Sequence, residues 1–366
     1  MAVCQLEEIE DEDLPQELLG LHKMQWLNYV HGITPDMNTK LARHLQKRGC
    51  RNSTALPGIE YDKTDRGIVI NKYTGMDTEP RIEREYGGIP VIGIADGAFK
   101  NRIHIRSITI PHGVMKIGSH AFEGCVSLKA VVFPDSLTAI GDSAFEDCEN
   151  LESVAVPKGV THLGERTFKG CRSLRSASIP DGVAELGKQT FENCEALTSV
   201  RLPARMTAIG ENAFSGCTGL TSIVIPKGVK VIKEHTFENC SSLVSVSIPR
   251  GVRQIEYAAF RGCSSLASVI IPKGVKEIDS YAFSDCISLT SVFIPGSVKK
   301  TGHYVFDGCT GLKNAVLTAR LKYMGFTVFK HCDQLTVICP KNSYAWKYCE
   351  ATGTRVQPRR LFTRYK

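Results

Sequence analysis

The sequence predicts a repeat solenoid of eleven coils, and three observations lead to this prediction. Phenylalanine recurs every 23 residues from Phe99 to Phe329 without an insertion or deletion. A cysteine stands three residues after each phenylalanine from Cys125 to Cys332, and Arg102 takes its place in the first coil. A period of about 20 to 50 residues is typical of solenoids and propellers, and propeller blades need roughly 40 residues or more, so this period indicates a solenoid.

Residues 1–57 lie outside the period and predict a helical hairpin or cap. Apolar residues recur at intervals of three or four between Leu14 and Val30, which indicates an amphipathic helix. Pro35 marks the start of a second helix that ends at Gly49. We expect the hairpin to cover the first coil, because solenoids need terminal caps to stay soluble. The alternatives are a docking module and a DNA-reading helix-turn-helix, for which the helix face lacks a dense basic cluster.

Residues 58–88 predict a strand-rich lead-in to the array. The segments 67–73 and 81–86 each have the composition of a short strand, and Gly75 and the pair Gly87-Gly88 mark turns. The repeat domain then extends over 89–340, and residues 341–366 form a helical cap with a basic tail.

Within each coil we expect one inward-facing strand. In the coil that contains Leu243, the spacing of Leu243, Val246 and Ile248 points three apolar side chains to the same side. Pro249 ends the strand, because proline lacks the amide hydrogen that a ladder needs. Two further apolar residues return the chain to the core, and Phe260 closes the back of the coil.

The ten cysteines of the repeat predict a column of free thiols. Equivalent residues of stacked coils lie roughly 4.8 Å apart, and parallel side chains at that spacing fit a disulfide dihedral of about 90° poorly. We therefore expect small buried apolar side chains with weak S–H donors. Free thiols also fit a reducing compartment better than an oxidising one.

The repeat unit Ile-Pro-x-Gly-Val-x-x-Ile-Gly-x-x-Ala-Phe-x-x-Cys-x-x-Leu-x-x-Val resembles the BspA-like class of leucine-rich repeats, most clearly over 110–128 and 202–220. The resemblance covers about 61–353. It includes 335–338, where the period shortens by one residue, and 343–349, which is similar to the helical end of such arrays. It implies an α/β-type leucine-rich-repeat superfold with mostly short parallel strands, a right-handed coil and terminal caps.

Members of this family are described as adhesins, matrix-protein binders and interaction proteins, so the resemblance implies a protein partner rather than a reaction. The sequence agrees, because it contains no phosphate loop, no H-E-x-x-H, no C-x-x-C and no nucleophile elbow. His331 beside Cys332 and His235 near Cys240 fail the spacing of zinc ligands. We expect no enzyme activity, no cofactor and no metal.

Charge and hydropathy bear on location. No apolar run reaches the roughly 18 residues of a membrane helix, and the first 20 residues are acidic where a signal peptide would be basic and then apolar. The family's secreted members carry an export signal and a wall anchor that this sequence does not show. We expect a cytoplasmic protein with no membrane insertion, and the cell surface or medium is the alternative.

Residues between the inward-facing ones of each strand should line an open, concave sheet face. One row there is serine from Ser153 to Ser291, followed by Asn314, and it serves either close packing or a polar floor for a partner. The next row becomes apolar in the carboxyl half and predicts an exposed patch that binds a partner. Its candidate residues are Val224, Ile270, Phe293 and Val316.

Basic residues follow the same strands from about the sixth coil onward. Lys227, Arg250 and Lys273 share one phase, and a second phase lies three residues later. Such a stripe attracts acidic proteins or anionic polysaccharide, whereas few aromatic residues accompany it for nucleic acid. The alternative is that lysines keep the array soluble. The second phase holds Lys230, Arg253, Lys276, Lys299 and Lys322.

The sequence therefore predicts a non-enzymatic protein that binds a macromolecule, with Ile270 and Phe293 at the centre of the site and Lys227, Arg250, Lys273 and Lys276 at its rim. One alternative is a surface or secreted adhesin for a host matrix protein or polysaccharide. Another is a structural spacer that presents residues 1–57.

Overall fold

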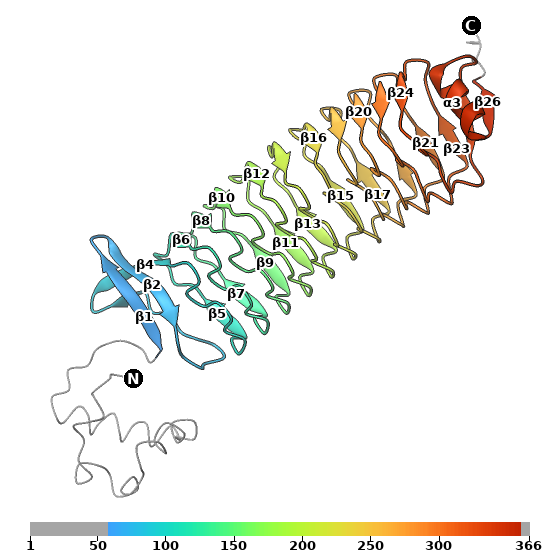
Figure 1. The fold of residues 1–366 in the computed structure, drawn as a ribbon. Coiled ribbons are helices and arrows are strands. Elements are labelled where there is room, and N and C mark those ends of the chain that lie inside the picture. The colour runs from blue at the N-terminus through green and yellow to red at the C-terminus, as the bar shows by residue number, and fades with distance from the viewer. Residues whose placement is uncertain (1–57, 360–366) are drawn as a thin grey trace, which may run out of the picture.

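The computed structural model describes residues 58–359, which form an elongated solenoid of stacked coils (Figure 1). Each repeat contributes two short parallel strands, one to each of two sides of the solenoid. The sequence predicted the first strand of each coil and not the second. The predicted hairpin of residues 1–57 and the end of the basic tail lie outside the described residues.

We call the outer surface of the first series of strands the serine face. Hydrogen bonding joins its strands in groups, so that the ladder is interrupted between β7 and β9, β13 and β15, and β19 and β21. The series consists of β5 (Ser107–Thr109), β7 (Ala130–Val132), β9 (Ser153–Ala155), β11 (Ser176–Ser178), β13 (Ser199–Arg201), β15 (Ser222–Val224), β17 (Ser245–Ser247), β19 (Ser268–Val269), β21 (Ser291–Phe293), β23 (Asn314–Val316) and β25 (Thr336–Cys339).

The second series has two residues per strand, because a glycine or a polar residue follows each pair and turns the chain toward the buried phenylalanine. It consists of β6 (Lys116–Ile117), β8 (Ala139–Ile140), β10 (His162–Leu163), β12 (Glu185–Leu186), β14 (Ala208–Ile209), β16 (Val231–Ile232), β18 (Gln254–Ile255), β20 (Glu277–Ile278), β22 (Lys300–Thr301) and β24 (Tyr323–Met324).

The lead-in differs from the prediction in one segment. β1 (Ile59–Thr64) and β2 (Gly67–Tyr73) form an antiparallel hairpin, and β2 pairs in parallel with β4 (Ile89–Ile94). The strand predicted over 81–86 is wrong, since only β3 (Glu85–Tyr86) is a strand there. The segment serves two sheets: Arg81 bridges to Thr109 on the serine face, and β3 pairs with β4. One straight strand cannot reach both.

Register follows the repeat. Ser176 lies opposite Ser199, 23 residues on, whereas Val316 lies opposite Ile338, which confirms the predicted shortening of the period by one. The predicted terminal helix is α3 (Tyr344–Thr352), where the Ser343 hydroxyl accepts a 3.2 Å hydrogen bond from the Trp346 amide. β26 (Val356–Pro358) then joins the sheet of the serine face beside β25.

A phenylalanine stack forms the spine of the core. Neighbouring rings lie 4.9 Å (Phe99 and Phe122) to 5.7 Å (Phe306 and Phe329) apart, with interplanar angles of 15° or less. Tyr73 of β2 stacks on Phe99 at 5.2 Å and begins the column. Such aromatic pairs contribute about 0.5–1.5 kcal/mol each beyond the burial of their area, so the stack joins every coil to the next.

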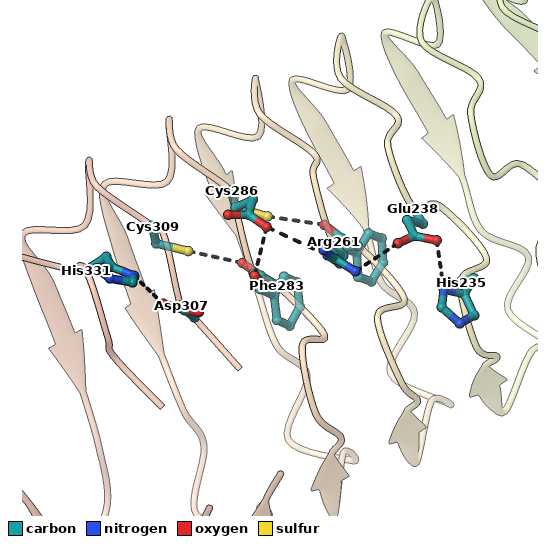
Figure 2. A network of polar contacts seen from close by, with 11 residues as sticks. His235, Glu238, Arg261, Phe283, Cys286, Asp307, Cys309 and His331 are labelled. Atoms are coloured by element: carbon teal, nitrogen blue, oxygen red, sulfur yellow. Dashed lines mark hydrogen bonds and ion pairs between the residues drawn. The ribbon is translucent and has the colours of Figure 1, made fainter. Parts of the chain in front are cut away.

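The cysteine column is confirmed. The ten repeat thiols are buried and free, and each Sγ donates a hydrogen bond to the carbonyl of the phenylalanine in the preceding coil; the bond from Cys309 to Phe283 (Figure 2) is 3.1 Å. Burial raises the pKa of Cys125 and of Cys332 to about 12, and it also raises the pKa of the seven repeat thiols from Cys148 to Cys286.

Two positions after each phenylalanine of the stack, the backbone adopts the left-handed conformation with positive φ. This pattern was not predicted from the sequence. Glycine alternates there with a residue that bears a longer polar side chain, all with φ between 55° and 73°. The Oδ1 atom of Asn239 occupies the space that a Cβ on Gly262 would need, and Asp285 does the same to Gly308. A long side chain in one coil therefore requires glycine in the next. The series is Asn101, Gly124, Asp147, Gly170, Asn193, Gly216, Asn239, Gly262, Asp285, Gly308 and His331.

Candidate binding surface

The serine face carries a row of exposed hydroxyls. The first residue of each strand from β9 to β21 is a serine, and Asn314 continues the row on β23; all of them are exposed. Strands pair in register, for example Ser222 with Ser245 and Ser245 with Ser268. Within residues 58–359 none of these seven serine hydroxyls has a hydrogen-bond partner, so the row can offer donors and acceptors to a bound molecule.

The apolar row lies two residues after these serines, where Val224, Phe293 and Val316 end their strands and Ile270 directly follows β19. Val224 is 77% exposed, Ile270 81% and Phe293 42%, whereas Val316 is half-buried. Phe293 and Val316 are direct cross-strand neighbours, and Ile270 belongs to the coil before Phe293. Ser247 separates Val224 from Ile270. The structure therefore brings three of the four predicted apolar residues together on successive coils and leaves Val224 two coils away.

Arg359 contacts this patch, and this contact was not predicted from the sequence. Its guanidinium carbon lies 6.0 Å from the centroid of the Phe293 ring. β26 positions it, because Arg359 directly follows Pro358, and its amide donates a 3.0 Å hydrogen bond to the Cys339 carbonyl. A cation over an aromatic face is attracted by about 0.5–1 kcal/mol at exposed sites. Part of Phe293 is thus covered by the chain itself, and Ile270 is the most exposed apolar residue of the patch.

The predicted basic residues are exposed, and no carboxylate of the described chain neutralises their positive charges. None of Lys227, Arg250, Lys273 and Lys276 forms an ion pair with a carboxylate of the described chain, and the same holds for the other members of their two phases. Elsewhere the array neutralises its charges across coils. On the side of the buried phenylalanines, the Glu238 carboxylate lies 2.8 Å from His235 Nδ1 of the same coil and forms an ion pair with Arg261 of the next coil at 3.6 Å (Figure 2). The rim cations, by contrast, have no carboxylate partner within residues 58–359.

The surface is also hollowed near the amino-terminal end of the array. A groove of about 640 Å³ is bounded by residues 79–84, by β5 and β7, and by the turns after those strands. Arg81 and Glu83 pair with each other there at 3.0 Å, and His112 forms no hydrogen bond with Ser107 of the same groove in the part of the chain that is described. Within the described residues the groove therefore shows no histidine–serine hydrogen bond of the kind that activates a nucleophile.

Residues 58–359 contain neither a candidate metal site nor a candidate membrane-spanning helix. No group of three or more histidine, cysteine, aspartate or glutamate side chains in this range is placed to hold a metal ion. No helix within it has the length and hydropathy needed to cross a bilayer.

Comparison with known proteins identifies the repeat. The profile described as "BspA type Leucine rich repeat region" matches residues 92–221 and 207–336, with six copies of the repeat. The chain belongs to the BspA-type leucine-rich-repeat family. This confirms the family that the sequence resembles and the leucine-rich-repeat solenoid that the resemblance implied; proteins of the family are generally non-enzymatic.

Solved structures of bacterial leucine-rich-repeat proteins are similar to this family member. A leucine rich cell surface protein of Faecalibacterium prausnitzii is 26% identical, with coverage of 80% of this chain and 96% of its own and a TM-score of 0.48. A leucine-rich-repeat protein of Treponema pallidum is 27% identical, with coverage of 59% of this chain and 91% of its own and a TM-score of 0.44. A Bacteroides ovatus leucine-rich repeat protein is 24% identical, with coverage of 84% and 99% and a TM-score of 0.48. No curated protein matches the chain.

Proposed function

We propose that this BspA-type protein is a non-enzymatic protein-binding molecule that uses the serine face of its carboxyl half. The observation that supports the proposal most is that Ile270 and Phe293, which are 81% and 42% exposed, lie on the same face of successive coils. Exposed apolar groups that cluster on one face are typical of interaction sites.

The surroundings of the patch have the composition of a protein interface. The apolar centre lies between a row of free hydroxyls and a rim of unpaired cations, which matches an interface with an apolar core and a polar, solvent-accessible rim. Because Lys227, Arg250, Lys273 and Lys276 are all basic, the rim fits an acidic partner surface and speeds its association. The partner is expected to insert an apolar side chain near Ile270 and to place carboxylates toward the turns.

The test is affinity capture from source-cell lysate and from culture medium, followed by titration of any captured protein. The double variant Phe293→Ala/Lys273→Glu removes one centre residue and one rim charge. We expect it to weaken binding at least about 30-fold, since a central aromatic residue contributes about 2 kcal/mol or more at such interfaces. The matched control is Val132→Ala/Lys158→Glu, which makes the same kinds of change on exposed residues of the amino half.

Equal capture by the wild type and the double variant would contradict the proposal. It would instead favour the alternative predicted from the sequence, in which residues 1–57 bind the partner. Equal weakening by the control pair would instead show that the binding surface is not confined to the carboxyl half.

A further inference from the structure

Five cations form a continuous row on the edge of the solenoid, between the serine face and the second series of strands. Each member directly precedes one strand from β16 to β24. Backbone hydrogen bonds join them coil to coil: the amide of Arg253 donates to the Lys230 carbonyl at 2.7 Å, and the amide of Lys276 donates to the Arg253 carbonyl at 2.8 Å. The row, here the cation row, is Lys230, Arg253, Lys276, Lys299 and Lys322.

The ladder fixes the spacing of these charges. Strands joined in this way lie about 4.8 Å apart, so the five positions extend over about 19 Å along the solenoid axis. The turns that contain Lys227, Arg250 and Lys273 lie directly beside the row and add three more positive charges. The result is a linear array of cationic side chains whose backbone positions repeat with the pitch of the coil.

These charges remain uncompensated in residues 58–359. Arg253 Nη1 donates to the Arg250 carbonyl at 3.1 Å, and Lys299 Nζ donates to the Gly296 carbonyl at 3.0 Å, both within turns of the same side. Glu277, the acid nearest in sequence to Lys276, pairs instead with Lys300 at 3.0 Å. Two unit charges at this spacing repel by about 0.9 kcal/mol even in water, so a stacked row carries a cost.

The fold does not require cations at this position. Every earlier coil of the second series carries an uncharged residue there, which is threonine at 138, 161 and 207, methionine at 115 and alanine at 184, and the hydroxyls of Thr138 and Thr207 donate to the carbonyls of Met115 and Ala184 in the preceding coil. Solubility alone would be served by lysines scattered over the surface. Five cations in register, in place of residues that bond to the neighbouring coil, indicate a ligand with charges at a similar repeat.

We propose that the cation row binds a linear anionic polysaccharide that carries carboxylate or sulfate groups on successive sugars. A chain of 1,4-linked pyranoses advances by a distance comparable to one coil per sugar, and rotation about its glycosidic bonds lets anionic groups of successive sugars approach the row. An extended acidic peptide places the side chains of one face about 6.6–7 Å apart and falls out of step with the row. Single-stranded nucleic acid needs aromatic platforms, and among the residues flanking the row in the described chain only Tyr323 is aromatic.

This site extends beyond the protein-binding surface, with which it shares Lys276, and it does not require the apolar centre of that surface. The turns after the strands of the serine face separate the cation row from Ile270 and Phe293. The variant Phe293→Ala should therefore leave polysaccharide binding unchanged, and its effect on protein capture can be measured separately.

The experiment titrates the full-length chain with heparin-derived oligosaccharides of defined length, with polyglutamate of matched charge, and with oligo-thymidylate. We expect affinity for the oligosaccharides to rise with length until they span about 19 Å, and to exceed the affinity for either other polyanion. The triple variant Lys230→Thr/Lys276→Thr/Lys299→Thr should lose about tenfold in affinity and depend less on salt. The control is Lys116→Thr/Lys129→Thr/Lys313→Thr, three exposed lysines outside the row, which should bind as the wild type does.

Three results would overturn the proposal. The first is no binding of the oligosaccharides at low salt by a wild-type chain that circular dichroism shows to be folded. The second is equal affinity for polyglutamate or oligo-thymidylate, which would mean attraction by net charge alone. The third is an equal loss in the control variant, which would remove the role of the row. Thermal denaturation of both triple variants keeps these outcomes separate from misfolding.

Discussion

The amino and carboxyl halves of this solenoid have the same core and different surfaces. Phe145 and Phe283 are both fully buried, and both stack on the ring of the next coil with interplanar angles of 15° or less. At the position before the second strand, however, Thr138 bonds to the preceding coil whereas Lys276 projects a free charge. Stacking constrains the inward positions equally in every coil, and it leaves the outward ones free to differ. Binding features can therefore gather in one half without a cost to the core.

The largest expected effect is on unfolding at alkaline pH. If the two halves have the same core, their buried thiols should change the pH dependence of the unfolding free energy by the same amount. Burial raises their pKa, so the folded chain keeps protons that the unfolded chain releases above about pH 8.5, and the free energy of unfolding falls as pH rises. Each buried thiol contributes up to about 1.4 kcal/mol per pH unit to that fall. Replacing three thiols by alanine should reduce the slope by about 4 kcal/mol per pH unit in either half.

The matched triples are Cys148, Cys171 and Cys194 in the amino half and Cys240, Cys263 and Cys286 in the carboxyl half. Urea unfolding followed by circular dichroism between pH 8.5 and about pH 10 measures the slope for each. Different slopes for the two triples would show that the halves differ in their core as well. A slope equal to that of the wild type in both would show that the thiols do not control alkaline stability.

The second test compares Phe145→Ala with Phe283→Ala. Each change removes a fully buried ring from the middle of a stack, and we expect a loss of about 3–5 kcal/mol of unfolding free energy in both halves. Phe293→Ala is the control, because the same truncation on the partly exposed ring should cost less than about 1 kcal/mol. Urea denaturation gives the three values, and a difference above about 2 kcal/mol between the first two variants would break the equivalence of the halves.

The smallest expected effect concerns the outward-facing position before the second strand, where the two halves carry different residues. Lys276→Thr converts one position of the cation row to the residue of the amino half, removes repulsion from two neighbouring cations and adds a hydroxyl that can bond to the Arg253 carbonyl. We expect a gain of about 0.5 kcal/mol in stability, largest at low salt. The reverse change, Thr138→Lys, is the control and should cost less, because it removes the hydroxyl's bond to the Met115 carbonyl but meets no cation at the equivalent positions of the adjoining coils. Destabilisation by Lys276→Thr would mean that the lysine serves the fold rather than a ligand.

Much of the fold could be predicted because a strict period repeats the same physical demand in every coil. Equal spacing of Phe99 to Phe329 predicted the stack, and the cysteines three residues later predicted buried, unpaired thiols. The second strand of each coil was missed because two residues are too few for an alternation signal. The strand predicted over 81–86 was wrong because composition does not reveal that a short segment can contact two sheets.

The binding surface was predictable in part. Position in the repeat identified Ile270 and Phe293 as outward-facing, since side chains alternate along a strand, and it identified the basic residues by their common phase. It did not predict that Arg359 lies over Phe293, because the two residues are 66 positions apart and meet only when β26 joins the sheet.

Periodicity alone thus sufficed for the solenoid, its register, its buried columns and the outward rows, since these depend on residues that stack on their own equivalents. The tertiary structure decided what neighbouring coils do to each other's side chains. It showed why Asn239 requires glycine at position 262, which charges are neutralised across coils, and that the cation row remains unpaired within the described chain. Contacts of this kind depend on the directions and reach of individual side chains, which spacing in a sequence does not record.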